Sequence, residues 1–130
     1  MRTINLFLTA IIIIFGCNRD SASNTIQTVK LGNLEIMTTD LGKMTNSKGK
    51  AACLNQGSGW RLPTRDEMIL IAQNRDKVPG IVTGGEYWTS TEFNPGFNDY
   101  IYIGITANSY FGNSSTDPTY KCFIRAVKFF

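Results

Sequence analysis

Apolar residues are distributed differently on the two sides of residue 25. Residues 6–15 form an almost continuous apolar run, LFLTAIIIIF, and residues 18–24 are small or polar. From Thr25 onward, apolar and aromatic residues come in short segments separated by Gly, Asn, Pro and Ser. The first run is about half of the ~20 residues that a membrane-spanning helix needs. The pattern therefore predicts a short leader followed by one globular part.

The short β-branched and aromatic segments indicate a strand-rich α+β domain. Residues 26–31 and 34–39 are expected to form two strands around Gly32-Asn33, a dipeptide that suits a tight hairpin turn. Further strands are predicted at residues 87–90, 99–105, 109–112 and 120–129.

Two short helices are expected between these strands. Ser47 is placed to cap a helix over residues 48–55. The clearest helix start is at Thr64, because Thr64 and Glu67 have the spacing of a capping box, in which each side chain accepts a hydrogen bond from the other's backbone amide. The side chains expected to face the core from this second helix are Met68, Ile69, Ile71 and Ala72.

Residues 100–105, YIYIGI, alternate between isoleucine and other residues. Because successive side chains of a strand point to opposite faces, one face is aliphatic and belongs in the core, and Tyr100 and Tyr102 share the other face. That aromatic face either lies under a covering loop or is exposed as a platform for a ligand. Tyr100 and Tyr102 are therefore candidate ligand-binding residues.

The leader has the organisation of an export signal, with a positive charge at Arg2 before the apolar run and a small residue, Gly16, before Cys17. Residues 14–17, IFGC, resemble the lipobox of bacterial lipoproteins, in which acyl chains such as palmitate are attached to the cysteine. An ordinary secretory signal and a buried strand are the alternatives. The lipobox resemblance implies a signal peptide at residues 1–16, lipidation of Cys17, a flexible tether at residues 17–24 and a folded domain at residues 25–130.

A lipidated protein of this kind is held on membrane lipid in the bacterial cell envelope, and the outer membrane or cell surface is the expected location. Removing 16 of the 130 residues leaves 114, which is enough for one small domain. The formal net charge of +3 falls to +2 without Arg2, and this excess is too small to support nucleic-acid binding by electrostatics alone. No nucleic-acid partner is expected.

Lipidation of Cys17 leaves Cys53 and Cys122 as the two cysteines of the folded domain. An even number of cysteines in an exported domain favours a disulfide, and two buried free thiols are the alternative. The chain has no histidine. Two thiolates alone do not complete a tetrahedral metal shell, so no metal cofactor is assigned to them.

Three ordered motifs carry a family resemblance. They are GWRLPTRDEM at residues 59–68, YWTSTE at residues 87–92 and CFIRAV at residues 122–127. Together they resemble the Lcl C-terminal domain family, over roughly residues 34–128. The resemblance implies a small C-type-lectin-like domain, related to the formylglycine-generating-enzyme fold, with two short helices packed on antiparallel strands. It also implies a disulfide between Cys53 and Cys122.

The same motifs have a plain structural interpretation. Trp60 and Leu62 alternate along an extended segment and are expected to share a buried face. Arg61 then points the other way and needs a carboxylate or carbonyl partner. Trp88 is also expected inside.

Enzymatic activity is not expected, because the chain lacks histidine, a G-x-S-x-G motif and a carboxylate pair at a spacing suited to acid–base chemistry. A glycan-binding module is the leading hypothesis, and the family resemblance suggests polysaccharide, including sulfated glycans. Lys43, Lys48 and Lys50 form a basic cluster that suits such anions, although a solvated helix start is the favoured explanation. The alternative function is a structural lipoprotein that docks on another envelope protein.

Phe97-Asn98-Asp99 resembles the W-N-D calcium motif of C-type lectins, with Phe in place of Trp. Asn98 and Asp99 carry oxygens suited to calcium. The partner triplet of that motif is absent, and a turn followed by a strand start also explains these residues. Asn98 and Asp99 are therefore taken as candidate ligand-binding residues, and no metal is assigned.

Overall fold

The computed structural model describes residues 25–130, which form an α+β fold. The predicted signal peptide, Cys17 and the predicted tether lie outside these residues. The strands are β1 (Thr28–Leu31), β2 (Leu34–Met37), β3 (Lys43–Thr45), β4 (Glu86–Glu92), β5 (Asn98–Ile103), β6 (Tyr110–Ser115), β7 (Lys121–Phe123) and β8 (Val127–Phe129). The helices are α3 (Asn46–Leu54), α4 (Arg65–Gln73) and the 3-10 helix η2 (Arg75–Lys77).

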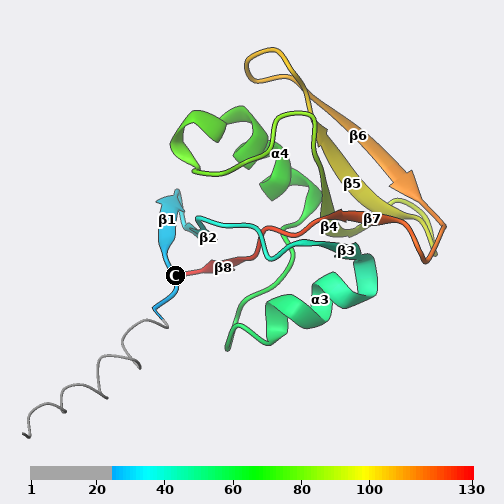
Figure 1. Cartoon of the computed structure of the whole chain (residues 1–130), viewed down its shortest axis with the longest axis horizontal. Helices are drawn as coiled ribbons and strands as arrows, with labels where there is room; N and C mark the ends of the chain where they lie inside the picture. The colour runs from blue at the N-terminus through cyan, green and yellow to red at the C-terminus, as the bar shows by residue number, and fades with distance from the viewer. Residues whose placement is uncertain (1–24) are drawn as a thin grey trace, which may run out of the picture.

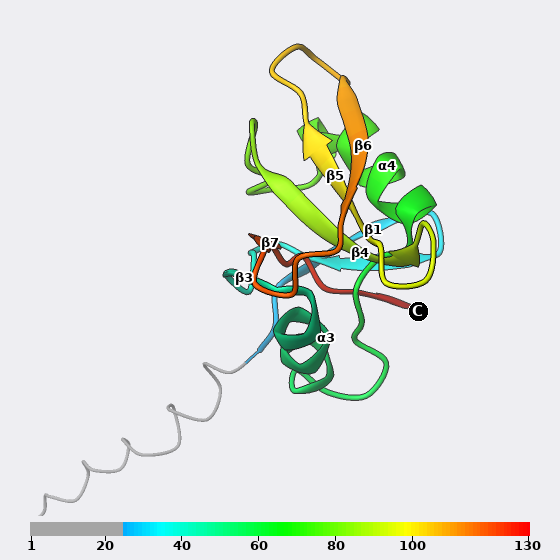
Figure 2. The same ribbon diagram turned by 90° about the vertical axis from the view of Figure 1, so that its right-hand side faces the viewer.

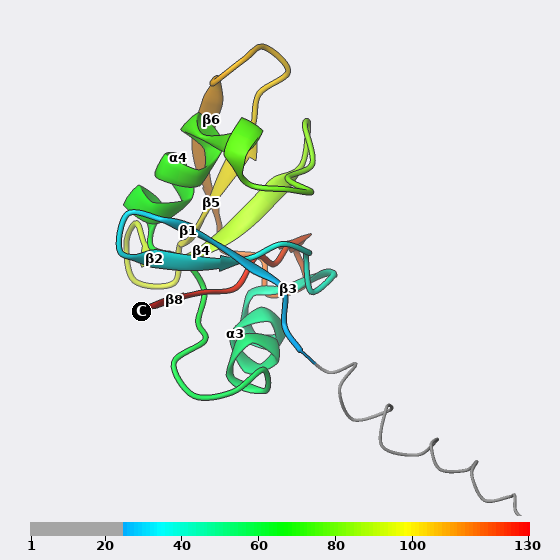
Figure 3. The ribbon, with the colours of Figure 1, turned by 90° about the vertical axis from the view of Figure 1, so that its left-hand side faces the viewer.

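The strands form two sheets (Figure 1). The smaller sheet has the antiparallel order β1-β2-β8, and Figure 3 shows it from the side where the C-terminus lies. The larger sheet has the order β3-β7-β4-β5-β6, with β4 and β7 parallel and the other pairs antiparallel. In Figure 2, β4, β5 and β6 form a twisted unit with α4 beside it and α3 below.

The two faces of the larger sheet belong to two different hydrophobic cores. Tyr87 and Ile101 lie with residues of α4 in the first core, whereas Trp88 and Tyr100 lie with Cys53 of α3 in the second. Neighbouring residues of one strand thus enter different cores, because successive side chains point to opposite faces. The sheet therefore separates an α4 side from an α3 side.

The hairpin predicted at Gly32-Asn33 is confirmed. Leu31 pairs with Leu34, and Gly32 has a φ of 62°, which a glycine adopts without steric cost. The single last strand predicted at residues 120–129 is wrong, because β7 and β8 lie in different sheets. Between them, the buried Arg125 donates to the carbonyls of Met37 and Pro79 and to the carboxylate of Asp40. The strand is interrupted where this side chain turns inward.

The capping box predicted at the start of α4 is confirmed. The Thr64 hydroxyl accepts from the Glu67 amide at 3.2 Å, and the Glu67 carboxylate accepts from the Thr64 amide at 2.8 Å. Met68, Ile71 and Ala72 are buried as predicted, and Ile69 is half-buried.

The predicted partner of Arg61 is also present, because its guanidinium donates to both carboxylate oxygens of Glu67, at 2.7 and 3.0 Å. Trp60, Leu62 and Trp88 are buried, as their positions in the motifs indicated.

The predicted cap of the first helix is wrong by two residues. Thr45, and not Ser47, caps α3, and its hydroxyl accepts from the Lys48 amide at 3.4 Å. The early start is explained by Asn46, which is buried and donates to the carbonyl of Thr89. At Gly49 any Cβ would collide with Ile124, so the absence of a side chain lets α3 pack directly on the chain between β7 and β8.

Cys53 and Cys122 are fully buried in the second core as free thiols. The predicted disulfide between them therefore stays a prediction, although one core holds both residues. Within residues 25–130, no helix is long and apolar enough to cross a membrane.

Candidate functional site

A pocket of about 310 Å³ opens on the α4 side of the larger sheet, where α4 begins beside β5 and β6. We call it the Arg65 pocket. Its lining residues come from three separate parts of the chain and are Arg65, Phe93, Asp99, Gly112, Asn113 and Ser114.

Strand register explains why these residues meet. Asp99 of β5 lies opposite Ser114 of β6, and Ile101 lies opposite Gly112. Directly opposed residues of antiparallel strands point to the same face. Gly112 and Ser114 therefore share the face of Asp99, and this is the face on which α4 packs.

An ion pair between Arg65 and Asp99 forms the floor of the pocket. Nη1 of Arg65 donates to Oδ1 of Asp99, and the hydroxyl of Thr89 donates to Oδ2 at 2.9 Å. The Asp99 side chain is only 1% exposed, whereas that of Arg65 is 36% exposed. The carboxylate is thus held from both sides, and the guanidinium is the charged group that a ligand meets.

Burial raises the pKa of Asp99 from its ordinary value, against the opposing effects of Thr89 and Arg65. A carboxylate in these surroundings depends on its cationic neighbour for compensation of its charge. Asp99 and Arg65 are therefore best treated as one balanced unit.

Two further features fix the position of Arg65. Its backbone amide donates to the Thr91 hydroxyl at 3.0 Å, which joins the start of α4 to β4. Its guanidinium also lies against Gly112, where any Cβ would collide with it. A larger residue at position 112 would displace the guanidinium from the strand surface.

The outer wall of the pocket is aromatic. Phe93 lies just beyond β4 and is 69% exposed. Its amide donates to the carbonyl of Phe97, and the Phe97 amide donates to the carbonyl of Asn94. These hydrogen bonds hold the turn that carries the ring, so an exposed phenyl ring stands next to the polar floor.

The structure separates Asn98 from Asp99. Asn98 lines a different pocket, of about 240 Å³, together with Asn46, Ser47, Lys50, Asp117 and Pro118. The two residues are adjacent on β5 and therefore face opposite sides of the sheet. The two side chains therefore do not converge on one ligand, and the Asp99 oxygens already bind Arg65 and Thr89. Residues 25–130 contain no cluster of three metal-binding side chains of the His, Cys, Asp or Glu type.

Tyr100 is not exposed. Its ring stacks beneath Tyr120 at a centroid distance of 5.4 Å, and it meets the edge of Trp88 at 5.6 Å. Of the two alternatives for the aromatic face, covered or exposed, the covered one is thus correct for Tyr100. Its assignment as a ligand-binding residue is wrong. Tyr102 is half-buried beside Phe111, which is 62% exposed, so only the outer part of the aromatic face meets solvent.

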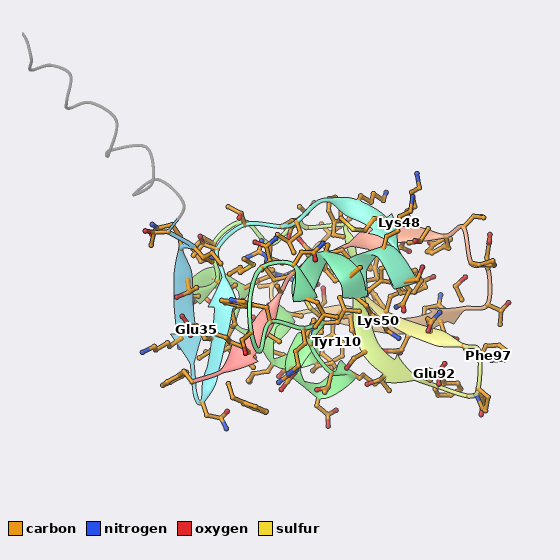
Figure 4. The ribbon with its side chains drawn as sticks, turned by 90° about the horizontal axis from the view of Figure 1, so that it is seen from below. Glu35, Lys48, Lys50, Glu92, Phe97 and Tyr110 are labelled. Carbon is orange, nitrogen blue, oxygen red and sulfur yellow. The ribbon has the colours of Figure 1, made fainter. Side chains whose placement is uncertain are left out.

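Lys48 and Lys50 do not form one basic site. They are two positions apart on α3, and residues at that spacing do not face each other on a helix. Figure 4 shows them on different sides of the α3 ribbon. Lys50 lines the pocket with Asn98, whereas Lys48 does not, and the Nζ of Lys43 lies over the Phe123 ring.

Sequence reasoning identified Asp99 but missed Arg65, Phe93 and Ser114. Arg65 directly follows Thr64, and the capping box alone accounted for the residues of this segment. Gly112 was the one available signal, as a glycine inside a strand marks a close approach of another group.

The chain matches no protein-family model and no curated protein. The geometry of the Arg65 pocket therefore carries the functional argument.

Proposed function

We propose that this protein is a carbohydrate-binding module of the bacterial cell envelope, anchored through lipid on Cys17, with the Arg65 pocket as its binding site. The observation that carries the proposal is the fixed Arg65–Asp99 pair beside the exposed ring of Phe93. A sugar ring has hydroxyl groups at its rim and an apolar face. Oriented charged and polar groups suit the hydroxyls, and an aromatic ring suits the apolar face.

The proposal assigns binding and no reaction. The chain has no histidine, and the two cysteines of the described fold are fully buried. Burial raises the pKa of Cys53 to about 11, so its thiol is protonated near neutral pH and is a poor nucleophile.

At the level of the fold, we propose a C-type-lectin-like domain similar to the Lcl C-terminal domain family. Three features support this. The first and last strands share the smaller sheet, two short helices pack on antiparallel strands, and the motif residues Trp60, Trp88 and Arg125 are all buried.

The position of the pocket is compatible with the proposed lipid anchoring through Cys17. In Figures 1 and 4, the chain enters the described fold next to β1 at one end of the molecule. The turn between β4 and β5, which carries Phe97, lies at the opposite end (Figure 4). After removal of a signal peptide at residues 1–16, lipid on Cys17 would therefore leave the Arg65 pocket facing away from the membrane.

A glycan array, followed by affinity measurements on the best ligand, tests the proposal. Phe93→Ala removes the aromatic wall without disturbing a core residue. We expect it to weaken binding roughly tenfold, the equivalent of about 1.5 kcal/mol. Phe111→Ala is the matched control, because Phe111 is similarly exposed but lies on the side of Tyr102. Equal binding by the parent protein and Phe93→Ala would contradict the proposal.

The outer strand of the larger sheet favours a second candidate function, docking to another envelope protein. Among the strands of residues 25–130, β6 pairs only with β5, so within this part of the chain its other edge is open to a further strand. Phe111 is a residue of β6. This function predicts no glycan binding, and it predicts a protein partner that is lost with Phe111→Ala and kept with Phe93→Ala.

A further inference from the structure

We infer that the Arg65 pocket selects uncharged saccharides with adjacent hydroxyl groups, and that Asp99 excludes sulfated and carboxylated ones. The inference rests on the proposed glycan binding and specifies its ligand class. It is opposite to what the lysine-rich start of α3 suggests from the sequence alone.

The paired charges that line the pocket disfavour anionic ligands. Arg65 and Asp99 are the two charged residues among those lining it, and they pair with each other. The formal charges of the described lining residues therefore sum to zero, although the guanidinium is the more exposed of the pair. An anionic group would have to compete with Asp99 for the guanidinium and would come close to a carboxylate with little access to water.

The surrounding cations do not change this balance. Lys50 lines the pockets on the α3 side of the sheet, with Asn98 in one and with Leu54 and Arg61 in the other. Arg61 itself is paired with Glu67 at 2.7 Å. Neither cation lines the Arg65 pocket, so neither compensates an anionic ligand there.

The hydrogen-bond donors of Arg65 suit a pair of adjacent hydroxyl groups. The guanidinium has five N–H donors in a planar fork, and its contact with Asp99 uses Nη1. Nη2 lies at the wall formed by Gly112. A planar fork can donate to two adjacent oxygens, and neighbouring hydroxyls of a sugar ring provide such a pair.

The β6 side of the pocket adds groups of both kinds. The Ser114 hydroxyl shares the face of Asp99 and can both donate and accept, whereas Asn113 lies opposite Tyr100, so its side chain points to the other face. A sugar hydroxyl can satisfy both the donor and the acceptor of the Ser114 hydroxyl, because it also donates and accepts hydrogen bonds. A sulfate group only accepts, so it would leave the acceptors of this wall without a partner.

The size of the pocket agrees with this ligand class. A volume of about 310 Å³ is at the lower end of the range for small-molecule sites, roughly 300–1,000 Å³. We therefore expect one or two sugar rings in the pocket, with an apolar ring face on Phe93.

Calorimetry on the full-length protein, purified from membranes in detergent, tests the inference. The probes are uncharged gluco-, manno- and galacto-oligosaccharides and, as the sulfated probe, a heparin tetrasaccharide. For the parent protein, we expect an uncharged probe to bind more tightly than heparin. We also expect its Kd to change by less than about twofold when the salt concentration rises tenfold, because screening acts on interactions between charges.

Asp99→Asn removes the negative charge and keeps an oxygen for the Thr89 hydroxyl. We expect this variant to bind heparin at least about tenfold more tightly than the parent protein, in a salt-sensitive manner, and to bind the uncharged probe more weakly. Asp66→Asn is the matched control, because it makes the same change of charge on an exposed residue of α4 that does not line the pocket. It should leave both affinities unchanged.

Two results would overturn the inference. One is tighter binding of heparin than of any uncharged probe by the parent protein, with affinity falling steeply with salt. The other is a folded Asp99→Asn variant with parental selectivity. If that variant fails to fold, the salt titration of the parent protein decides alone. Binding of neither probe type would overturn the proposed glycan-binding function, and this inference with it.

Discussion

At the scale of single residues, burial controls the protonation of the two cysteine thiols of the folded domain. Cys53 lies on α3 and Cys122 on β7, and both are fully buried in the same core. Burial raises the pKa of both thiols, and Glu86 raises that of Cys122 further. Both are therefore protonated near neutral pH. The disulfide implied by the sequence therefore has to form before the core closes over the two thiols.

We predict a disulfide between Cys53 and Cys122 in the exported protein. Its intact mass without reductant should be lower than the mass after reduction by two hydrogen atoms. On the chain-entropy model, closing a loop of this length stabilises the fold by about 4 kcal/mol. Denaturant unfolding of a double variant, Cys53→Ala with Cys122→Ala, should show a loss of this order.

The reduced parent protein is the control for this double variant. Under reducing conditions the two should differ much less in stability, because neither contains the bridge. Alkylation of both thiols in denaturant without reductant would rule the disulfide out.

At the scale of elements, the two helices differ in how well their first turns are capped. Thr64 and Glu67 cap α4 reciprocally, and Glu67 also binds Arg61. The N-cap of α3 is a single side-chain hydrogen bond, in which the Thr45 hydroxyl accepts from the Lys48 amide at 3.4 Å. The first turn of α3 has no acidic residue. The cap of α4 also fixes Arg65, the next residue, so helix capping and pocket geometry are coupled.

We predict that Thr64→Ala lowers the free energy of unfolding by about 1 kcal/mol, a typical value for a lost N-cap. Thr45→Ala is the matched control and should cost less, because its hydrogen bond is longer and has no reciprocal partner. Denaturant unfolding of both variants measures the difference. Equal losses would show that the capping box at Thr64 adds nothing to an ordinary cap.

The acid side of the stability profile provides a further prediction for the same cap. Burial opposes ionisation of Glu67, but hydrogen bonds from Arg61 and Thr64 outweigh it and lower its pKa. The stabilisation is therefore complete above the pKa of an unfolded glutamate, about 4.3, and is lost as the pH falls through the lower folded value. Glu67→Gln should lose less stability over this range, measured by unfolding at stepwise lower pH. A parallel decline of variant and parent would contradict the assignment.

The elements that the sequence predicted are those with local causes. The turn at Gly32, the capping box at Thr64 and the alternation of residues 100–105 each depend on neighbouring residues. The break before β8 depends instead on Arg125, whose partners lie near residues 40 and 79. The cover over Tyr100 comes from Tyr120, and the Arg65 pocket needs the register of β5 with β6. Contacts over such separations leave no local pattern.

At the scale of the whole molecule, the proposed anchor and the proposed binding site belong to opposite ends of the fold. The smaller sheet and the entry of the chain lie at one end, and the turn between β4 and β5 lies at the other (Figures 1 and 4). The eight residues at positions 17–24 span at most about 28 Å when fully extended. Lipid on Cys17 would thus hold the domain close to the membrane with the Arg65 pocket outward.

We predict that Cys17 alone carries the lipid. In cells supplied with alkyne-palmitate, the parent protein should be labelled and Cys17→Ala should not be. Cys53→Ala is the matched control, because it removes a cysteine that is fully buried in the second core, and its labelling per molecule of protein should equal that of the parent. Since the Arg65 pocket lies at the far end of the fold, Cys17→Ala should keep the affinity of the parent protein for its glycan. Labelling that persists in Cys17→Ala would contradict anchoring at this position.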